Sequence, residues 1–157
     1  MTPRSVAHAT FVIERSLAAP VKRVFAAWSD LAWKRRWASC HDDWRTEEHQ
    51  LDFRVQGTEI NRTVEPDGTV HTMKAHFLDI MPDERIVYVY GMEVGEVPIS
   101  FSLVTVTFAL ARSRTKMTFT EQVTFLDCGG DLDERREGTE VGFARLDLVL
   151  APPPASA

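Results

Sequence analysis

The last stretch of the sequence, residues 134–150, constrains the fold more than any other. Placed at about 100° per residue, its apolar side chains spread over most of the circumference of an α-helix, and Glu140, Arg145 and Asp147 fill the gaps. A helix that is apolar on so many sides is expected to be buried on more than one of them. It needs a wide apolar surface to lie in, and the strand-like middle of the chain can supply one. We therefore predict that residues 10–125 wrap around a C-terminal helix.

Length and composition indicate one domain with an ordinary globular core. The chain has 157 residues, of which 44% are hydrophobic and 26% are charged. We predict a single domain over residues 1–157, with an ordered core at residues 10–150. The Pro-rich tail at residues 151–157 is expected to stop the last helix, because proline cannot continue it.

Charge and targeting signals exclude several classes of function. The chain carries 23 acidic and 18 basic side chains, a formal net charge of −5, which disfavours binding to nucleic acid through phosphate contacts. No basic start followed by an apolar run resembles a signal peptide, and no apolar run approaches the ~20 residues that span a bilayer. We predict a cytoplasmic protein with no membrane insertion, in which Cys40 and Cys128 are free thiols.

Two short helices are predicted after a first strand at residues 10–18. Pro20 stands where a helix can begin, and an apolar face follows at Val21, Val24, Phe25 and Trp28. Asp30 is a candidate N-cap for a second helix. On that helix Trp33 and Trp37 are expected to share one face, and the basic residues 34–36 are expected to point outward.

The middle of the chain predicts an antiparallel meander. Strands are expected at residues 51–55, 59–65, 70–80, 86–90, 101–111 and 116–125, with irregular segments at 38–50 and 91–98. Short connections such as the Pro-Asp-Gly turn at residues 66–68 favour antiparallel neighbours. The predicted fold class is α+β: a seven-stranded antiparallel sheet, two short helices after the first strand and a long C-terminal helix.

Several segments resemble the family of activators of heat-shock protein 90 ATPase homologues, in the START-like, polyketide-cyclase-like (SRPBCC) superfamily. The matching segments are residues 11–15, 19–20, 24–28, 36–37, 78–88, 118–122 and 142–143, with Gly138. The resemblance implies a helix-grip fold, in which a curved sheet closes on the C-terminal helix and leaves a cavity between them. The family has no shared catalytic set, so the resemblance implies no mechanism.

Strand parity provides the best indication of what faces this cavity. In the last strand, Met117, Phe119, Glu121, Val123 and Phe125 share the apolar, inner face. A carboxylate there must find a partner or meet water. Glu121 is therefore either a ligand-anchoring or acid/base group, or it is an ion-pair partner of an inward Arg or Lys or accepts a hydrogen bond from a tyrosine. We expect Glu121→Ala to change ligand binding more than stability.

Other candidate site residues come from the neighbouring strands and the helix. Tyr88 and Tyr90 share a face with Ile86 and Met92, and their hydroxyls can orient a polar ligand if that face is the inner one. The tyrosines can equally be core residues. Trp28 is expected in the core, whereas Trp37 and Trp44 are candidates for a lid. The predicted lining of the cavity is Phe53, Tyr88, Tyr90, Phe119, Glu121 and Phe143.

No motif indicates a metal or cofactor. The five histidines form no HExxH pair, the two cysteines form no CxxC, and neither GxGxxG nor a P-loop occurs. We therefore predict no metal and no cofactor.

The leading functional hypothesis is a non-enzymatic protein that binds a small hydrophobic or amphipathic molecule. A cyclase- or hydrolase-type enzyme with Glu121 as acid/base is the first alternative. The second is a module that interacts with a chaperone or another protein through an exposed patch on the outer sheet face. Homodimerisation through the sheet or residues 38–50 stays open.

Overall fold

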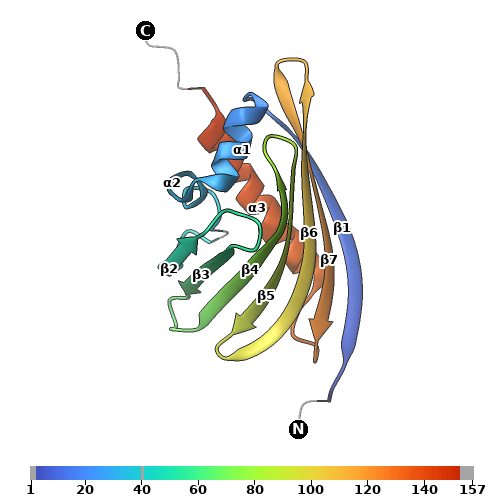
Figure 1. Ribbon diagram of the computed structural model, residues 1–157. Coiled ribbons are helices and arrows are strands. Elements are labelled where there is room, and N and C mark those ends of the chain that lie inside the picture. Colours follow the sequence, from blue (N-terminus) through green and yellow to red (C-terminus); the bar gives the residue numbers. More distant parts are fainter. Residues whose placement is uncertain (1–2, 40, 153–157) are drawn as a thin grey trace.

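One antiparallel sheet with three helices on one of its faces makes up the protein (Figure 1). The computed structural model describes residues 3–39 and 41–152. The sheet order is β1-β7-β6-β5-β4-β3-β2, so the first and last strands are neighbours. The elements follow the chain in this order: β1 (Val6–Leu17), α1 (Val21–Ser29), α2 (Leu31–Lys34), β2 (Arg45–Leu51), β3 (Thr58–Val64), β4 (Val70–Met81), β5 (Arg85–Val94), β6 (Val97–Ala111), β7 (Arg114–Leu126) and α3 (Leu132–Leu150). The predicted α+β helix-grip fold is confirmed.

Two segments differ from the predicted strands. The strand expected at residues 51–55 lies earlier, as β2, and Phe53 falls in the turn after it, where Gln56 has a φ of 69° and donates its N–H to the carbonyl of Phe77. β2 is an edge strand whose only fully buried residue is His49, so it carries no apolar alternation to reveal it. The loop expected at residues 91–98 is instead a tight turn at Gly95, whose φ is +64°, between extended strands.

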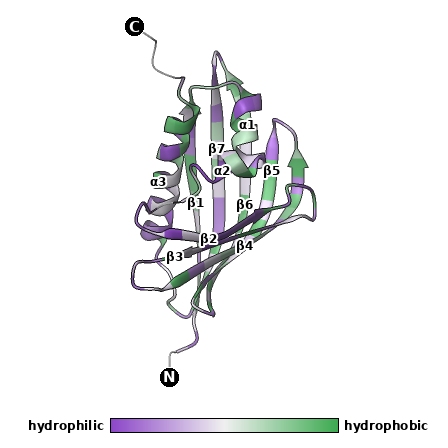
Figure 2. Ribbon diagram, turned by 90° about the vertical axis from the view of Figure 1, so that its left-hand side faces the viewer, coloured by the Kyte–Doolittle hydropathy of each residue, from purple (hydrophilic) through white to green (hydrophobic). Residues whose placement is uncertain are grey.

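The core lies between the sheet and the helices, which face one another in Figure 2. Its centre is aromatic. Trp28 of α1 contacts Trp37, Phe143 and Phe119, with ring centroids 4.8, 6.2 and 6.5 Å apart. Phe119 and Phe143 lie edge to face at 5.1 Å. These rings join α1, α3 and β7, and pairs at such distances add to the stabilisation from burial.

The terminal helix corrects our prediction about its burial. α3 buries Gly142, Phe143, Leu146 and Leu150 along one side only, while Leu148 keeps 77% of its surface exposed. It packs against β1 and α1 rather than being enclosed by the sheet. The prediction that it is buried on several sides is wrong, because single apolar side chains are tolerated on a helix surface and do not by themselves indicate a contact.

The second helix confirms its predicted cap and corrects its predicted surface. The Asp30 carboxylate accepts the N–H groups of Ala32 and Trp33 at 2.9 and 3.3 Å. Lys34 does not point outward but is 5% exposed. Because the helix ends at Lys34, Trp37 is no longer on its surface and turns to Trp28 instead of sharing a face with Trp33.

Two further predictions concern the membrane and the cysteines. No helix within the described ranges is long and apolar enough to cross a membrane. Cys128 is a free, exposed thiol, and Cys40 lies outside the described residues.

Candidate functional site

Glu121 lies on the inner face of β7 and points into the interior, as strand parity predicts. Met117, Phe119, Val123 and Phe125 are buried with it, and Glu121 itself is 1% exposed. Across the sheet, Glu121 faces Val104 of β6, and Val104 faces Tyr88 of β5. This register places Glu121 and both tyrosines on one inner surface.

A single carboxylate oxygen of Glu121 organises the first polar cluster. It accepts hydrogen bonds from the hydroxyls of Tyr90 and Ser102, each at 2.7 Å, and from the Arg135 guanidinium at 3.0 Å. Arg135, from the first turns of α3, also donates to the Ser100 hydroxyl at 2.6 Å. Both structural alternatives that the sequence left open for Glu121, an ion pair and a tyrosine hydrogen bond, are therefore present together.

The electrostatics of this cluster follow from burial. Burial, followed by the charge of Glu121, raises the pKa of the Tyr90 phenol well above its usual value. Burial alone would lower the pKa of Arg135, but Tyr90 and Glu121 outweigh it and raise that pKa. Tyr90 is therefore a neutral donor and Arg135 a fixed cation.

A second buried ionic cluster was not predicted from the sequence. Glu59 of β3, 2% exposed, pairs through one oxygen with the Lys34 ammonium at 2.5 Å and through the other with His49 Nε2 at 2.7 Å. Burial opposes ionisation of Glu59, but Lys34 and His49 outweigh it and lower the pKa of its carboxyl. The parity of β3 puts Glu59 and Asn61 on one face, but the mixed polarity of this strand does not show that this face is the inner one.

Tyr88 lies on the same face and is near both clusters. Its ring centroid is 5.8 Å from that of Phe77 and 6.1 Å from that of Tyr90. Burial, together with the charges of Glu121 and Glu59, raises the pKa of the Tyr88 phenol well above its usual value. Among the hydrogen bonds within residues 3–39 and 41–152, none involves the Tyr88 hydroxyl, so this donor is available.

The inner face is not equally covered along the sheet. On β1, β6 and β7 the inward side chains are buried: Phe11, Ile13, Val104, Val106, Phe119 and Val123. On β3, β4 and β5 the inward residues Glu59, Ala75, Phe77 and Ile86 are also buried, but five others keep part of their surface accessible: Asn61, Met73, Tyr88, Tyr90 and Met92. The partly accessible side chains lie on the half of the sheet away from β1, the strand against which α3 packs.

The six residues predicted to line a cavity fall into two groups. Tyr88, Tyr90 and Glu121 lie together on the inner face, and the half-buried Phe53 is next to them through Phe77, with ring centroids 5.1 Å apart. Phe119 and Phe143 instead lie within the aromatic core around Trp28, as described above. The structure therefore brings four of the six to one place.

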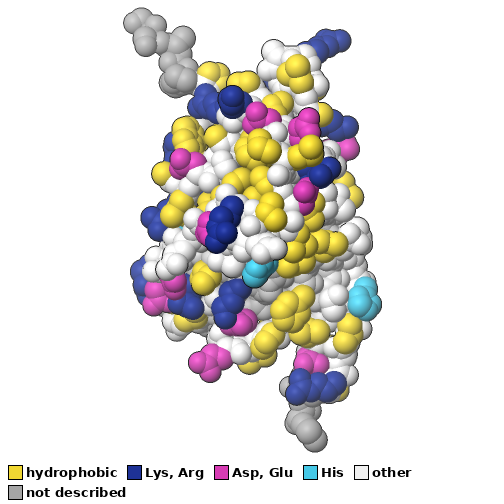
Figure 3. All heavy atoms as spheres, in the orientation of Figure 1, with side chains coloured by type: hydrophobic (Ala, Val, Ile, Leu, Met, Phe, Trp, Pro, Cys, Tyr) yellow, Lys and Arg dark blue, Asp and Glu magenta, His cyan; other side chains and the backbone are white. Residues whose placement is uncertain are grey.

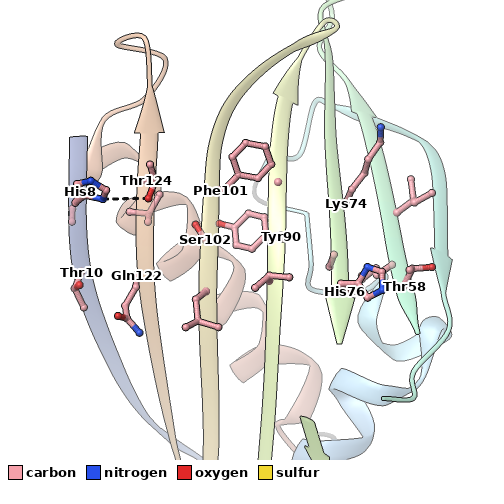
Figure 4. A pocket seen from close by; sticks show the side chains of 18 residues that line it. His8, Thr10, Thr58, Lys74, His76, Tyr90, Phe101, Ser102, Gln122 and Thr124 are labelled. Atoms are coloured by element: carbon pink, nitrogen blue, oxygen red, sulfur yellow. Dashed lines mark hydrogen bonds between the residues drawn. The ribbon is translucent and has the colours of Figure 1, made fainter. Parts of the chain in front are cut away.

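The outer face of the sheet carries a broad hollow that the sequence did not predict. Hydrophobic side chains form a band across this face (Figure 3). The hollow, of about 1060 Å³, crosses six strands, from His8 on β1 to Thr58 on β3 (Figure 4). Phe101, 55% exposed, lies in it with Val89 and Leu103.

The described part of the chain contains no group of three or more His, Cys, Asp and Glu side chains placed to hold a metal ion. Trp44, a candidate for a lid, stacks on His41 and lies beside the tilted ring of His71, with centroid distances of 3.9 and 4.4 Å. His71 also contacts Glu65 at 3.0 Å.

Comparison with known families settles the relationship of the chain. Residues 18–151 match the family described as Activator of Hsp90 ATPase homolog 1-like protein. The chain belongs to this family. Its SRPBCC-type fold is one that commonly binds ligands. Among curated proteins, no sequence matches.

Solved structures of similar proteins share the fold of this chain. A protein from Rhizobium leguminosarum is 50% identical, with a TM-score of 0.91 over 95% of this chain and 98% of that one. A protein from Rhizobium loti is 40% identical, with a TM-score of 0.86 over 93% and 99%. An AHSA1-like protein from Aeromonas hydrophila, 20% identical with a TM-score of 0.71 over 90% and 91%, is similar in fold alone.

Proposed function

We propose that this protein binds a small apolar or amphipathic molecule between the inner face of β3–β5 and α3, in the cytoplasm and without catalysing a reaction. The observation that carries the proposal is Tyr88, a half-buried side chain on the inner face whose hydroxyl has no hydrogen-bond partner among the described residues. Met73 and Met92 are partly accessible on the same face and would contact the apolar part of a ligand. Burying apolar surface there would contribute ~25 cal/mol per Å².

The pairing of Glu121 argues against the enzymatic alternative. A general base needs a carboxylate that can take up a proton from the substrate. Glu121 already accepts three hydrogen bonds and is the counter-charge of Arg135. Protonating it would leave a buried guanidinium uncompensated, which is costly.

Native mass spectrometry of the gently purified protein tests the proposal. We expect a bound small molecule that is released on denaturation. Met92→Trp would fill the inner face, and Val89→Trp is the matched control on the outer face. Met92→Trp should lose the bound species and Val89→Trp should retain it. If only the unliganded mass is found, and a screen of apolar aromatic compounds gives no binding, the proposal is wrong.

A second candidate function is contact with an Hsp90-type chaperone, which the family description suggests. The observation that favours it is the exposed apolar cluster of Val89, Phe101 and Leu103 on the outer face. Purified chaperone should bind the protein, and Leu103→Glu should weaken binding at least several-fold without unfolding the sheet. Absence of binding and of ATPase stimulation at high concentration would reject this candidate.

A further inference from the structure

We propose that the inner site selects an uncharged ligand with an apolar body and one hydrogen-bond acceptor, such as a carbonyl oxygen, which receives the Tyr88 hydroxyl. This inference rests on the proposed binding function and adds the chemical class of the ligand. It follows from three features of the inner face: its paired charges, the Tyr88 hydroxyl that the described residues leave unpaired, and its apolar walls.

The charges of the inner face are already paired. The side chains of Glu59 and Lys34 are 1% and 6% exposed, and those of Glu121 and Arg135 are 1% and 12% exposed. Each carboxylate therefore has its own cation. An ionised ligand entering between these pairs would lose its hydration without gaining a free counter-charge, and that loss is expensive in a low-dielectric interior. The site consequently disfavours carboxylates and amines.

The free donor determines the polar group of the ligand. Tyr90 is committed to Glu121 at 2.7 Å, whereas Tyr88, two residues along the same strand, is not engaged by the described residues. The Tyr88 phenol stays protonated, so it can donate one hydrogen bond but cannot form an ion pair. A neutral acceptor such as a ketone, ester or amide oxygen satisfies it.

The walls around Tyr88 are aromatic and flexible. The ring of Phe77 meets Tyr88 and Phe53 at 61° and 70°, so three aromatic rings pack edge to face beside the Tyr88 hydroxyl. Met73 and Met92 lie across from one another on β4 and β5. Methionine adapts to irregular shapes, so the apolar body of the ligand is not restricted to one outline.

Three probes of nearly the same shape test this inference by calorimetry. They are acetylnaphthalene, with a carbonyl; isopropenylnaphthalene, in which a methylene replaces that oxygen; and naphthoate, which is ionised. We expect the ketone to bind roughly 3- to 10-fold more tightly than the alkene, the range of one neutral hydrogen bond, and naphthoate to bind most weakly.

The variant Tyr88→Phe keeps the ring and removes the hydroxyl. It should weaken ketone binding by the same several-fold factor and leave alkene binding unchanged. The carbonyl stretching band of the ketone bound to the unmodified protein provides a second measurement, because a hydrogen bond lowers its frequency. This measurement does not depend on the folding of the variant.

The outcomes separate this inference from the proposed function. Equal affinity for ketone and alkene, or tightest binding of naphthoate, overturns the inference while the binding function stands. Failure of all three probes overturns the inference, and if native mass spectrometry also finds no bound species, the proposed function falls with it.

Discussion

At the scale of single residues, the Glu121 carboxylate is the shared acceptor of three side-chain donors. Removing the carboxylate leaves Arg135 buried without its counter-charge and leaves two hydroxyl donors without an acceptor. Breaking a buried ion pair in this way costs about 3–5 kcal/mol of unfolding free energy. We therefore expect a large loss of stability, measured by urea unfolding, rather than a selective loss of binding.

A double variant is the control for this prediction. Replacing both partners, with Glu121→Leu and Arg135→Met, removes the charge imbalance and should recover most of the lost stability, because apolar side chains of similar size can replace a buried pair. If Glu121→Ala unfolds at the same urea concentration as the unmodified protein, the ion pair contributes little.

Strand parity predicted Glu121 but not Glu59, for a physical reason. β7 alternates over thirteen residues, and its buried side is unambiguous because nearly every inward residue is apolar. β3 has seven residues of mixed polarity, so its sequence does not show which side is buried. Lys34 was assigned to the surface because lysine is rarely buried, and only its partner on a distant strand explains its position.

At the scale of elements, β5 holds the only two tyrosines of the chain, and both have raised pKa values in the folded state. A group whose folded pKa is raised contributes stability that is present below its unfolded pKa, about 10 for tyrosine, and is lost as pH rises through the folded pKa. We expect phenolate absorbance to stay absent near pH 10 and to appear together with unfolding.

Circular dichroism over the same pH series is the control for the tyrosine titration. Phenolate that forms near pH 10 while the sheet signal is intact would contradict the raised pKa values of both tyrosines. In Tyr90→Phe, the remaining phenolate should still appear only on unfolding, because burial is the main cause of the raised pKa of Tyr88.

The one-sided burial of α3 leads to a prediction about two leucines a half-turn apart. Leu146 is 0% exposed and Leu148 is 77% exposed. Leu146→Ala should cost about 2–5 kcal/mol, as for other buried leucines, whereas Leu148→Ala should change stability by no more than about 0.5 kcal/mol. Comparable losses at both positions, by urea unfolding, would indicate that the outer side of α3 is covered in solution.

Some helices and strands could be predicted from sequence patterns and others could not. Helix starts at Pro20 and Asp30 and the long strands were predictable because they depend on local chemistry. The edge strand β2 and the extended ends of β5 and β6 were not, because they are fixed by hydrogen bonds to neighbouring strands. Periodicity in residues 134–150 likewise predicted the helix but not which of its apolar side chains are covered.

At the scale of the whole molecule, the two faces of the sheet carry two separable surfaces. The inner face has paired charges and partly accessible Tyr88, and the outer face has the apolar hollow around Phe101. The overall fold was predictable because the order of the elements agreed with the family resemblance. The outer hollow was not, because it depends on the twist of six strands together.

Because the inner site and the outer hollow lie on opposite faces of the sheet, substitutions on one face should not change how a ligand on the other face affects global stability. A ligand that binds only the folded state adds about 2.7 kcal/mol at one hundred times its Kd, and for a domain of this size that corresponds to a Tm rise of roughly 5–10 °C. If the ligand occupies the inner face, Leu103→Glu on the outer face should show the same rise and Met92→Trp should show little of it. A scanning calorimetry series with acetylnaphthalene measures this. The opposite result, with the rise lost in Leu103→Glu and kept in Met92→Trp, would place the ligand in the outer hollow, because the two substitutions lie on opposite faces of adjacent strands.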